Sequence, residues 1–202
     1  MGVSMLTLLI VIIVIVVLLL LWGVGIYNRL VQLRNQVNNA WSQIDVQLQR
    51  RYDLIPNLVE AVKGYMTYEK GTLEAVINAR NQAQNARTQV ERSGGPTSSS
   101  IKELAAADAA VRGAVTNIMA LAENYPQLRA SENMQQLQEE LSSTENKVAF
   151  ARQAYNDNVM RYNTTQQEFP AVLLAATFGH HPVELFQVED QQVKKAPKIS
   201  FS

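Results

Sequence analysis

One uninterrupted apolar run limits what this chain can fold into. Residues 5–22 read MLTLLIVIIVIVVLLLLW, in which Thr7 is the only polar side chain. About 20 apolar residues in a helix cross the roughly 30 Å hydrocarbon core of a bilayer. The basic start and the A-x-A-like site of a cleaved signal peptide are missing. We therefore predict a short N-terminus, residues 1–4, and an uncleaved transmembrane anchor over residues 5–26. The anchor side chains expected to face membrane lipid are Met5, Leu6, Leu8, Leu9, Ile10, Val11, Ile12, Ile13, Val14, Ile15, Val16, Val17, Leu18, Leu19, Leu20, Leu21 and Trp22.

The charges next to the anchor predict its orientation. Residues 1–4 carry no charged side chain, whereas Arg29 and Arg34 closely follow the apolar run. The positive-inside rule favours a cytoplasmic body and a short N-terminus outside. A body on the outer, periplasmic side of the same anchor stays open as the alternative.

The overall composition excludes several function classes. Formal net charge is +0, so the charge balance predicts no nucleic acid as partner. The chain has no cysteine, which rules out disulfides, thiolate nucleophiles and cysteine metal sites.

After the anchor, apolar residues recur every three or four positions, which indicates helices and no strands. The first of these stripes is Leu30, Leu33, Val37, Trp41, Ile44 and Leu48. We predict an all-α body over residues 27–186, arranged as an antiparallel up-down bundle of about four helices that continues from the anchor.

Turn residues set the predicted boundaries inside this body. Gly64 weakens a helix and Thr67 can restart one, with Glu69 in the new first turn. A Gly/Pro/Ser-rich loop is predicted at residues 92–100, with Ser99 or Ser100 as the cap of the next helix. Pro170 ends the longest helix, and residues 187–202 form a polar tail.

The stretch RRYDLIPN, residues 50–57, allows two interpretations. Asp53 is a good N-cap, and a proline such as Pro56 is tolerated in a first turn but costs about 3 kcal/mol inside a helix. Arg50 and Arg51 would then complement the dipole at the end of the preceding helix. These signals favour a corner near residues 52–53. The apolar phase nevertheless continues through Pro56, as it would in a kinked continuous helix. The residues assigned to the corner are Arg50, Arg51, Asp53, Pro56 and Asn57. Cap and dipole roles account for them without a catalytic function.

Near the C-terminus, two further groups of residues are candidates. His180, His181 and Glu184 have a spacing that suits a metal on a helix. However, Pro182 intervenes and two adjacent histidines point their rings apart, so no set of three ligands is evident and structural histidines are favoured. The apolar segment from Phe169 to Phe178 is too short to span a membrane. It can close the end of the bundle as a short helix, or it can form a contact near the membrane or with a neighbouring subunit. The side chains predicted for that contact are Phe169, Val172, Leu173, Leu174, Phe178 and Phe186.

Several motifs taken together resemble the LemA family. They are the DLIPNLVEAVKGY block from residue 53, the ENYPQL block from residue 123, and the ending YNTTQQEFPAVLLAATFGHHPVELF. The resemblance covers nearly the whole chain. It implies a single-pass protein of a bacterial cell (inner) membrane with a helical body, and it brings no established activity, cofactor or catalytic residue.

We therefore expect a non-enzymatic membrane scaffold that binds no cofactor. The anchor lacks a small-xxx-small pattern, so homo-oligomers should form through the body, whose polar faces are rich in Gln and Asn. The first alternative is an adaptor for another membrane protein, such as a quality-control protease or a sensor. A metal-dependent hydrolase at His180, His181 and Glu184 is less favoured.

Overall fold

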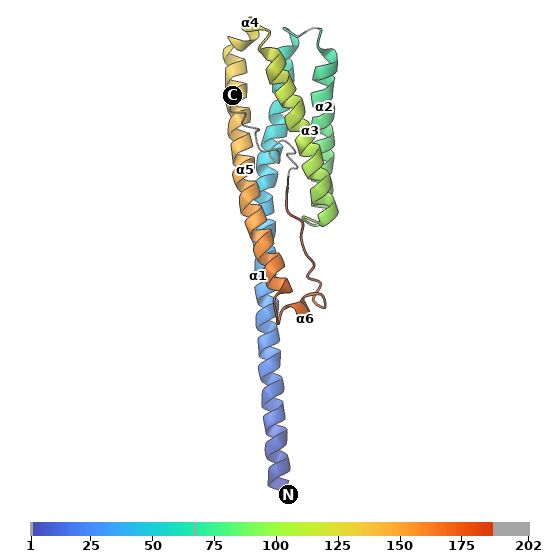
Figure 1. Cartoon of the computed structure of the whole chain (residues 1–202), viewed down its shortest axis with the longest axis vertical. Helices are drawn as coiled ribbons and strands as arrows, with labels where there is room; N and C mark the ends of the chain where they lie inside the picture. The colour runs from blue at the N-terminus through green and yellow to red at the C-terminus, as the bar shows by residue number, and fades with distance from the viewer. Residues whose placement is uncertain (1, 67, 188–202) are drawn as a thin grey trace, which may run out of the picture.

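A computed structural model describes residues 2–66 and 68–187, with side chains from Met5 onward. Every regular element in this part of the chain is a helix. The elements are α1 (Gly2–Lys63), α2 (Lys70–Arg92), α3 (Ser98–Ala122), α4 (Pro126–Arg129), α5 (Glu132–Gln167) and α6 (Val172–Ala175) (Figure 1). The predicted all-α class is therefore confirmed.

The long helices alternate in direction. Helix α1 rises from the N-terminus, α2 descends, α3 rises, and α5 descends to the lower end of the body (Figure 1). Helix α1 packs along α5, and α2 packs along α3. The lower part of α1 projects alone below this bundle-like body.

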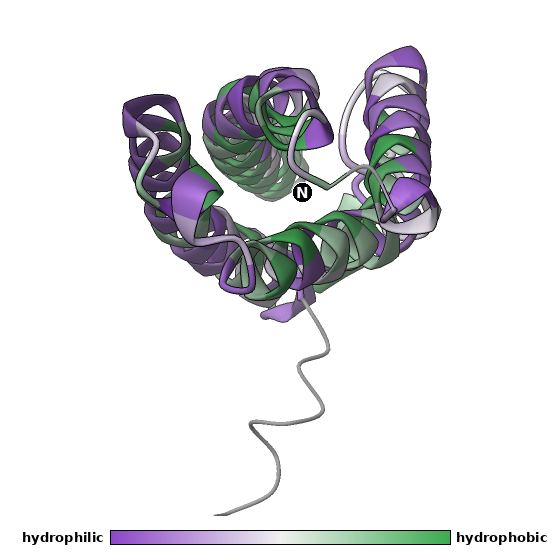
Figure 2. Cartoon of the chain, turned by 90° about the horizontal axis from the view of Figure 1, so that it is seen from above, coloured by the Kyte–Doolittle hydropathy of each residue, from purple (hydrophilic) through white to green (hydrophobic). Residues whose placement is uncertain are grey.

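The core follows the apolar stripes. Hydrophobic residues mainly line the space between the helices, and hydrophilic residues lie mostly on the outer faces (Figure 2). On α1, every stripe position named above is buried. The fully buried aromatic side chains are Tyr52, Tyr155, Tyr162 and Phe186. Because each helix buries a single stripe, burial of apolar area drives this packing.

The predicted corner near residues 52–53 is wrong, because α1 runs without interruption from Gly2 to Lys63 and contains Pro56. A proline has no N–H, so the carbonyl of Tyr52 loses its helical donor. Helix α2 supplies a substitute: Arg80 Nε donates to the Tyr52 carbonyl at 3.2 Å. The helix therefore continues because a tertiary contact replaces the missing hydrogen bond. Asp53 does not cap a helix here; it is exposed and accepts a hydrogen bond from Gln49 at 2.7 Å.

The connection between α1 and α2 lies where Gly64 and the polar residues after it predict a break. Helix α1 ends just before Gly64, and α2 begins after Glu69, which is its N-cap position and not part of its first turn. Thr67 lies outside the described residues.

The loop between α2 and α3 is shorter than predicted, because α3 already begins at Ser98. Its N-cap is Thr97, not Ser99 or Ser100. Thr97 and Ser100 form a reciprocal capping box, which satisfies two backbone N–H groups at the helix start.

Within the part of the chain that the structure describes, two helices are long and apolar enough to cross a membrane: the one that contains Met5–Lys63, and Ser98–Ala122. They differ in their surroundings. None of the most apolar part of α1 is buried, and its side chains from Met5 to Trp22 are about half exposed or more. Helix α3 instead packs its apolar stripe against α2 and carries a buried Asp108. We therefore assign α3 to the core of the body.

Beyond α5, the chain turns through α6 and then returns along the body as an extended strap, residues 180–187 (Figure 1). Asn163 clamps the strap by donating to the Val183 carbonyl and accepting from its N–H. Asn156 makes the same pair of bonds with Phe186. These side chains replace the partner strand that extended backbone otherwise needs.

Candidate functional site

An ion cluster joins three helices in the upper half of the body; its Arg51–Asp108 pair is buried, whereas Arg112 and Glu145 are partly exposed. Arg51 of α1, 3% exposed, donates to Asp108 of α3 and to Glu145 of α5. Tyr52 adds a hydroxyl bond to Asp108 at 3.0 Å. Arg112 lies 3.9 Å from Asp108 and 3.7 Å from Glu145, so two cations face two anions. The cluster is therefore neutral as a whole.

Burial shapes the electrostatics of this cluster. Desolvation lowers the pKa of Arg51, and the charge of Glu145 opposes that shift. Burial also raises the pKa of Tyr52 to about 12, so its hydroxyl stays protonated and can donate to Asp108. Replacing a buried ion pair with apolar residues is often neutral for stability, but a lone buried charge is very costly. The cluster is thus suited to fixing which helices pair and in what register.

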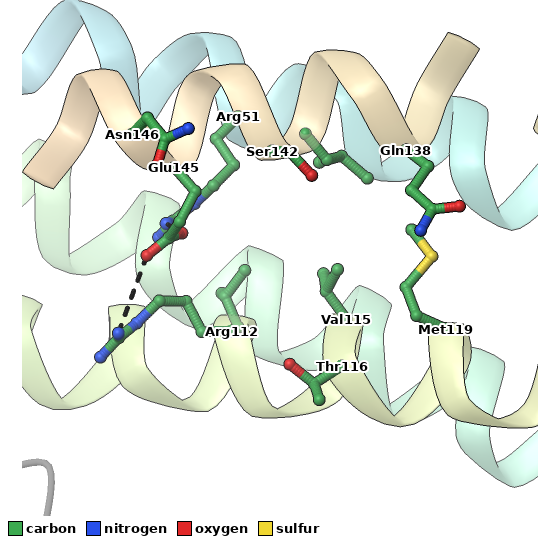
Figure 3. A pocket seen from close by; sticks show the side chains of 11 residues that line it. Arg51, Arg112, Val115, Thr116, Met119, Gln138, Ser142, Glu145 and Asn146 are labelled. Carbon is green, nitrogen blue, oxygen red and sulfur yellow. Dashed lines mark hydrogen bonds and ion pairs between the residues drawn. The ribbon is translucent and has the colours of Figure 1, made fainter. Parts of the chain in front are cut away.

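An open pocket of about 460 Å³ adjoins the cluster. Side chains of α3 and α5 face each other across it, with the Arg112–Glu145 pair at one end (Figure 3). Val115 and Met119 lie on its α3 side, and Gln138 and Ser142 on its α5 side. Arg51 donates to both carboxylates of the cluster, whereas Arg112 contacts them only as an ion pair. Among the residues that the structure describes, the Nε atoms of both arginines are buried without a hydrogen-bond partner.

The sequence contains a signal for this ion cluster in the spacing of its apolar stripes, although no recognisable motif marks it. Core positions of α1 recur at 44, 48, 51, 55 and 58, and those of α3 at 101, 104, 108, 111 and 115. Arg51 and Asp108 each occupy a position in the stripe where an apolar residue is expected. Two opposite charges in two apolar stripes predict a buried pair. The local end signals instead place Arg51 at a helix end, and no motif points to Asp108, Arg112 or Glu145.

The other residues of the predicted corner lie on the surface of α1. Arg50, Asp53, Pro56 and Asn57 are all exposed. Of the five residues, the structure brings only Arg51 into the core, so they do not form a common site.

The two histidines do not form a site with Glu184. The strap is extended, so the spacing expected on a helix does not apply. His180 Nδ1 lies 3.0 Å from the Tyr162 hydroxyl, and Glu184 pairs with Lys102 at 3.6 Å. Within residues 5–66 and 68–187, no three potential His, Cys, Asp or Glu ligands gather around a metal position. Burial and the nearby charges of Arg34 and His181 lower the pKa of His180.

The predicted membrane-proximal residues divide into two groups. Phe169, Val172, Leu173 and Phe178 are exposed, and Leu174 lies close to Gly23 of the anchor. The prediction for Phe186 is wrong, because it is fully buried with its ring 6.2 Å from that of Trp41. Trp41 lies 14 residues beyond Tyr27, or about 21 Å further along α1. The strap carries Phe186 away from the anchor.

These features define an all-helical protein in which one apolar N-terminal helix continues into a body fixed by an ion cluster. The chain belongs to the LemA family, whose model matches residues 40–201.

Similar proteins include magnetosome protein MamQ of Magnetospirillum gryphiswaldense, which is 25% identical over 79% of this chain and 64% of its own length. Magnetosome protein MamQ 2 of Paramagnetospirillum magneticum is 24% identical over 80% of this chain and also 64% of its own length. Protein LemA of Metamycoplasma hominis is 26% identical over 83% of this chain and 71% of its own length. The chain therefore matches just under two thirds of the length of the magnetosome relatives. The long apolar helix, whose side chains are uncovered from Met5 to Trp22, supports a membrane location.

Proposed function

We propose that the chain is a non-enzymatic membrane scaffold that associates with copies of itself through its body. The observation that carries the proposal is the continuity of α1, which links the anchor to the top of the body without a hinge. Residues 27–63 of this helix extend about 55 Å at the α-helical rise. A continuous helix of this length holds the upper end of the body at a fixed distance from the membrane, as a scaffold requires.

The outer surface of the body offers apolar side chains for self-association. Phe150 of α5 is 74% exposed and Val46 of α1 is 59% exposed. The contacts of Trp41 with Tyr155 and of Arg51 with Glu145 fix the antiparallel register of α1 and α5. In that register Val46 and Phe150 lie at the same level along α1. Exposed aromatic residues are enriched at protein interfaces, which supports an interface at this level.

The bilayer in question is the bacterial cell (inner) membrane, with the N-terminus outside and the body in the cytoplasm. Arg29 supports this orientation, because it is exposed just beyond the apolar span. Arg34 supports it less, since its guanidinium also lies over the Tyr162 ring at 5.8 Å and is partly committed to the fold. A reporter fused to either end of the full chain tests the orientation.

The mass of the full-length protein in mild detergent tests self-association. A homomeric species larger than one chain is the expected result. A stoichiometric complex with a different membrane protein would instead identify an adaptor, and a monomer without partners would refute both proposals.

Phe150→Glu is the variant that tests the interface, and it should reduce the homomeric species. Gln153→Glu is its matched control, because it adds the same charge at an exposed position one turn away on α5 without removing apolar area. Equal loss of assembly in both variants would contradict an apolar interface at Phe150.

A further inference from the structure

Residues 169–178, which we call the foot, expose an unusual amount of apolar surface. This segment reads FPAVLLAATF and contains no charged side chain. Phe169 is 77% exposed and Leu173 is 67% exposed, with Val172 and Phe178 also exposed. Most other large apolar side chains of the body are buried, so the foot resembles the anchor more than the rest of the body.

Contacts place the foot beside the upper end of the apolar span. The Phe178 ring lies 5.2 Å from the Tyr27 ring, edge to face. A Cβ atom at Gly23 would stand 3.9 Å from the Leu174 side chain.

The first half of the foot reaches the same level of α1. Phe169 lines a pocket together with Leu21, Trp22 and Arg29. Arg29 is the first charged residue in the chain, and the other α1 residues beside the foot lie on its anchor side.

The depth of the foot follows from the helical rise. Gly23 precedes Arg29 by six residues, which is about 9 Å along α1. The Arg29 side chain can extend to the level of the lipid headgroups, as arginines at the ends of membrane helices do. The foot then lies at a depth similar to that of interfacial segments, whose apolar faces are buried about 5–10 Å into the headgroup and acyl boundary.

We propose that the foot is a second membrane contact. It inserts Phe169, Val172, Leu173 and Phe178 into the leaflet that faces the body of the protein. Lipid is the occupant because the exposed foot is continuous with the span, whose own side chains are uncovered. The body is thereby held at two points, by α1 and by the end of α5. This inference does not depend on self-association of the body.

Spin labels on single cysteines test the proposal, since the natural chain has no cysteine. Leu173→Cys and Phe169→Cys label the foot. Tyr68→Cys is the aqueous control, because Tyr68 is 96% exposed in the turn between α1 and α2, beyond the end of α1 that is distant from the anchor. Ile15→Cys is the control within the span. The full-length variants are reconstituted in vesicles of phosphatidylethanolamine and phosphatidylglycerol, and collisions with oxygen and with a water-soluble nickel chelate are compared.

Oxygen is concentrated in the acyl region and the chelate in water, so their collision ratio reports depth. Both foot labels should give a ratio clearly above that at Tyr68 and between the ratios at Tyr68 and Ile15, as expected for a depth near the headgroup and acyl boundary. A foot ratio equal to that at Tyr68 would overturn the proposal. Dipolar broadening at Leu173 that disappears on dilution with unlabelled chain would also overturn it, since a second copy would then cover the foot. If the label at Ile15 also gave the low ratio of a label in water, the assignment of the membrane anchor itself would be wrong, and not only that of the foot.

Discussion

Arg80→Met should destabilise the protein because Pro56 makes α1 dependent on Arg80. The Arg80 guanidinium donates to the Tyr52 carbonyl at 3.2 Å, and Tyr52 is fully buried. A hydrogen bond from a charged donor contributes about 1.5–3 kcal/mol to stability. Arg80 also lies 4.0 Å from exposed Asp53, a pair worth less than about 1 kcal/mol. We therefore expect Arg80→Met to lower the free energy of unfolding by about 2–3 kcal/mol.

The decisive comparison is the same substitution in a Pro56→Ala background. Alanine restores the backbone N–H that proline lacks, so the Tyr52 carbonyl regains its helical donor. Arg80→Met should then cost only about 1 kcal/mol, and the coupling energy between the two sites should be about 1–2 kcal/mol. Asp53→Asn is the control for the surface pair. An equal cost of Arg80→Met in both backgrounds would refute the explanation for the continuous helix.

Tryptophan fluorescence can follow this cycle. The chain has two tryptophans, and Trp41 is 6% exposed between α1 and α5, where its ring packs on Tyr155. A Trp22→Phe background leaves Trp41 as the sole reporter of the body. Guanidinium unfolding in detergent micelles then gives the free energies, and an unchanged slope against denaturant would show that only stability changed.

The ion cluster and the strap lead to three further predictions. Arg51→Met should lower the free energy of unfolding by about 3–5 kcal/mol, and Asp108→Leu in the same chain should recover most of it, as measured by the same denaturation. Burial raises the Tyr52 pKa to about 12 from its usual 10.0, so the free energy of unfolding should fall by about 2 kcal/mol as pH rises from about 10 to about 12. Tyr52→Phe should flatten this slope relative to the wild type. Asn163→Ala should speed hydrogen exchange at the Val183 amide, and unchanged exchange there would show that the clamp is not needed to hold the strap.

Local signals predicted the elements of this fold well. The apolar run gave the lower part of α1, and stripes at helical spacing gave α2, α3 and α5, because burial of one face is encoded in the spacing of neighbouring residues. The break after Lys63 followed from Gly64 in the same way. The boundary at Thr97 was missed by two to three residues because several adjacent hydroxyl side chains can all cap a helix.

The candidate site was less predictable, because its partners are distant in sequence. Arg51 is separated from Asp108 by 57 residues and from Glu145 by 94. The spacing within each helix showed two charges in apolar stripes, but only the pairing of helices brings them together. The same holds for the strap, where Asn163 and Val183 meet through a turn in the chain.

By itself, the sequence determined that the chain is all-helical, that an apolar helix precedes a body with its own core, and that the body carries the marks of its family. Tertiary structure decided how Pro56 is accommodated. The local sequence favoured a corner, since a proline inside a helix leaves a carbonyl without a donor. Arg80 lies 28 residues away from Tyr52 and supplies that donor only after α2 has packed against α1. That contact stabilises α1 as one continuous element through the motif, and so joins the apolar N-terminal segment to the top of the body.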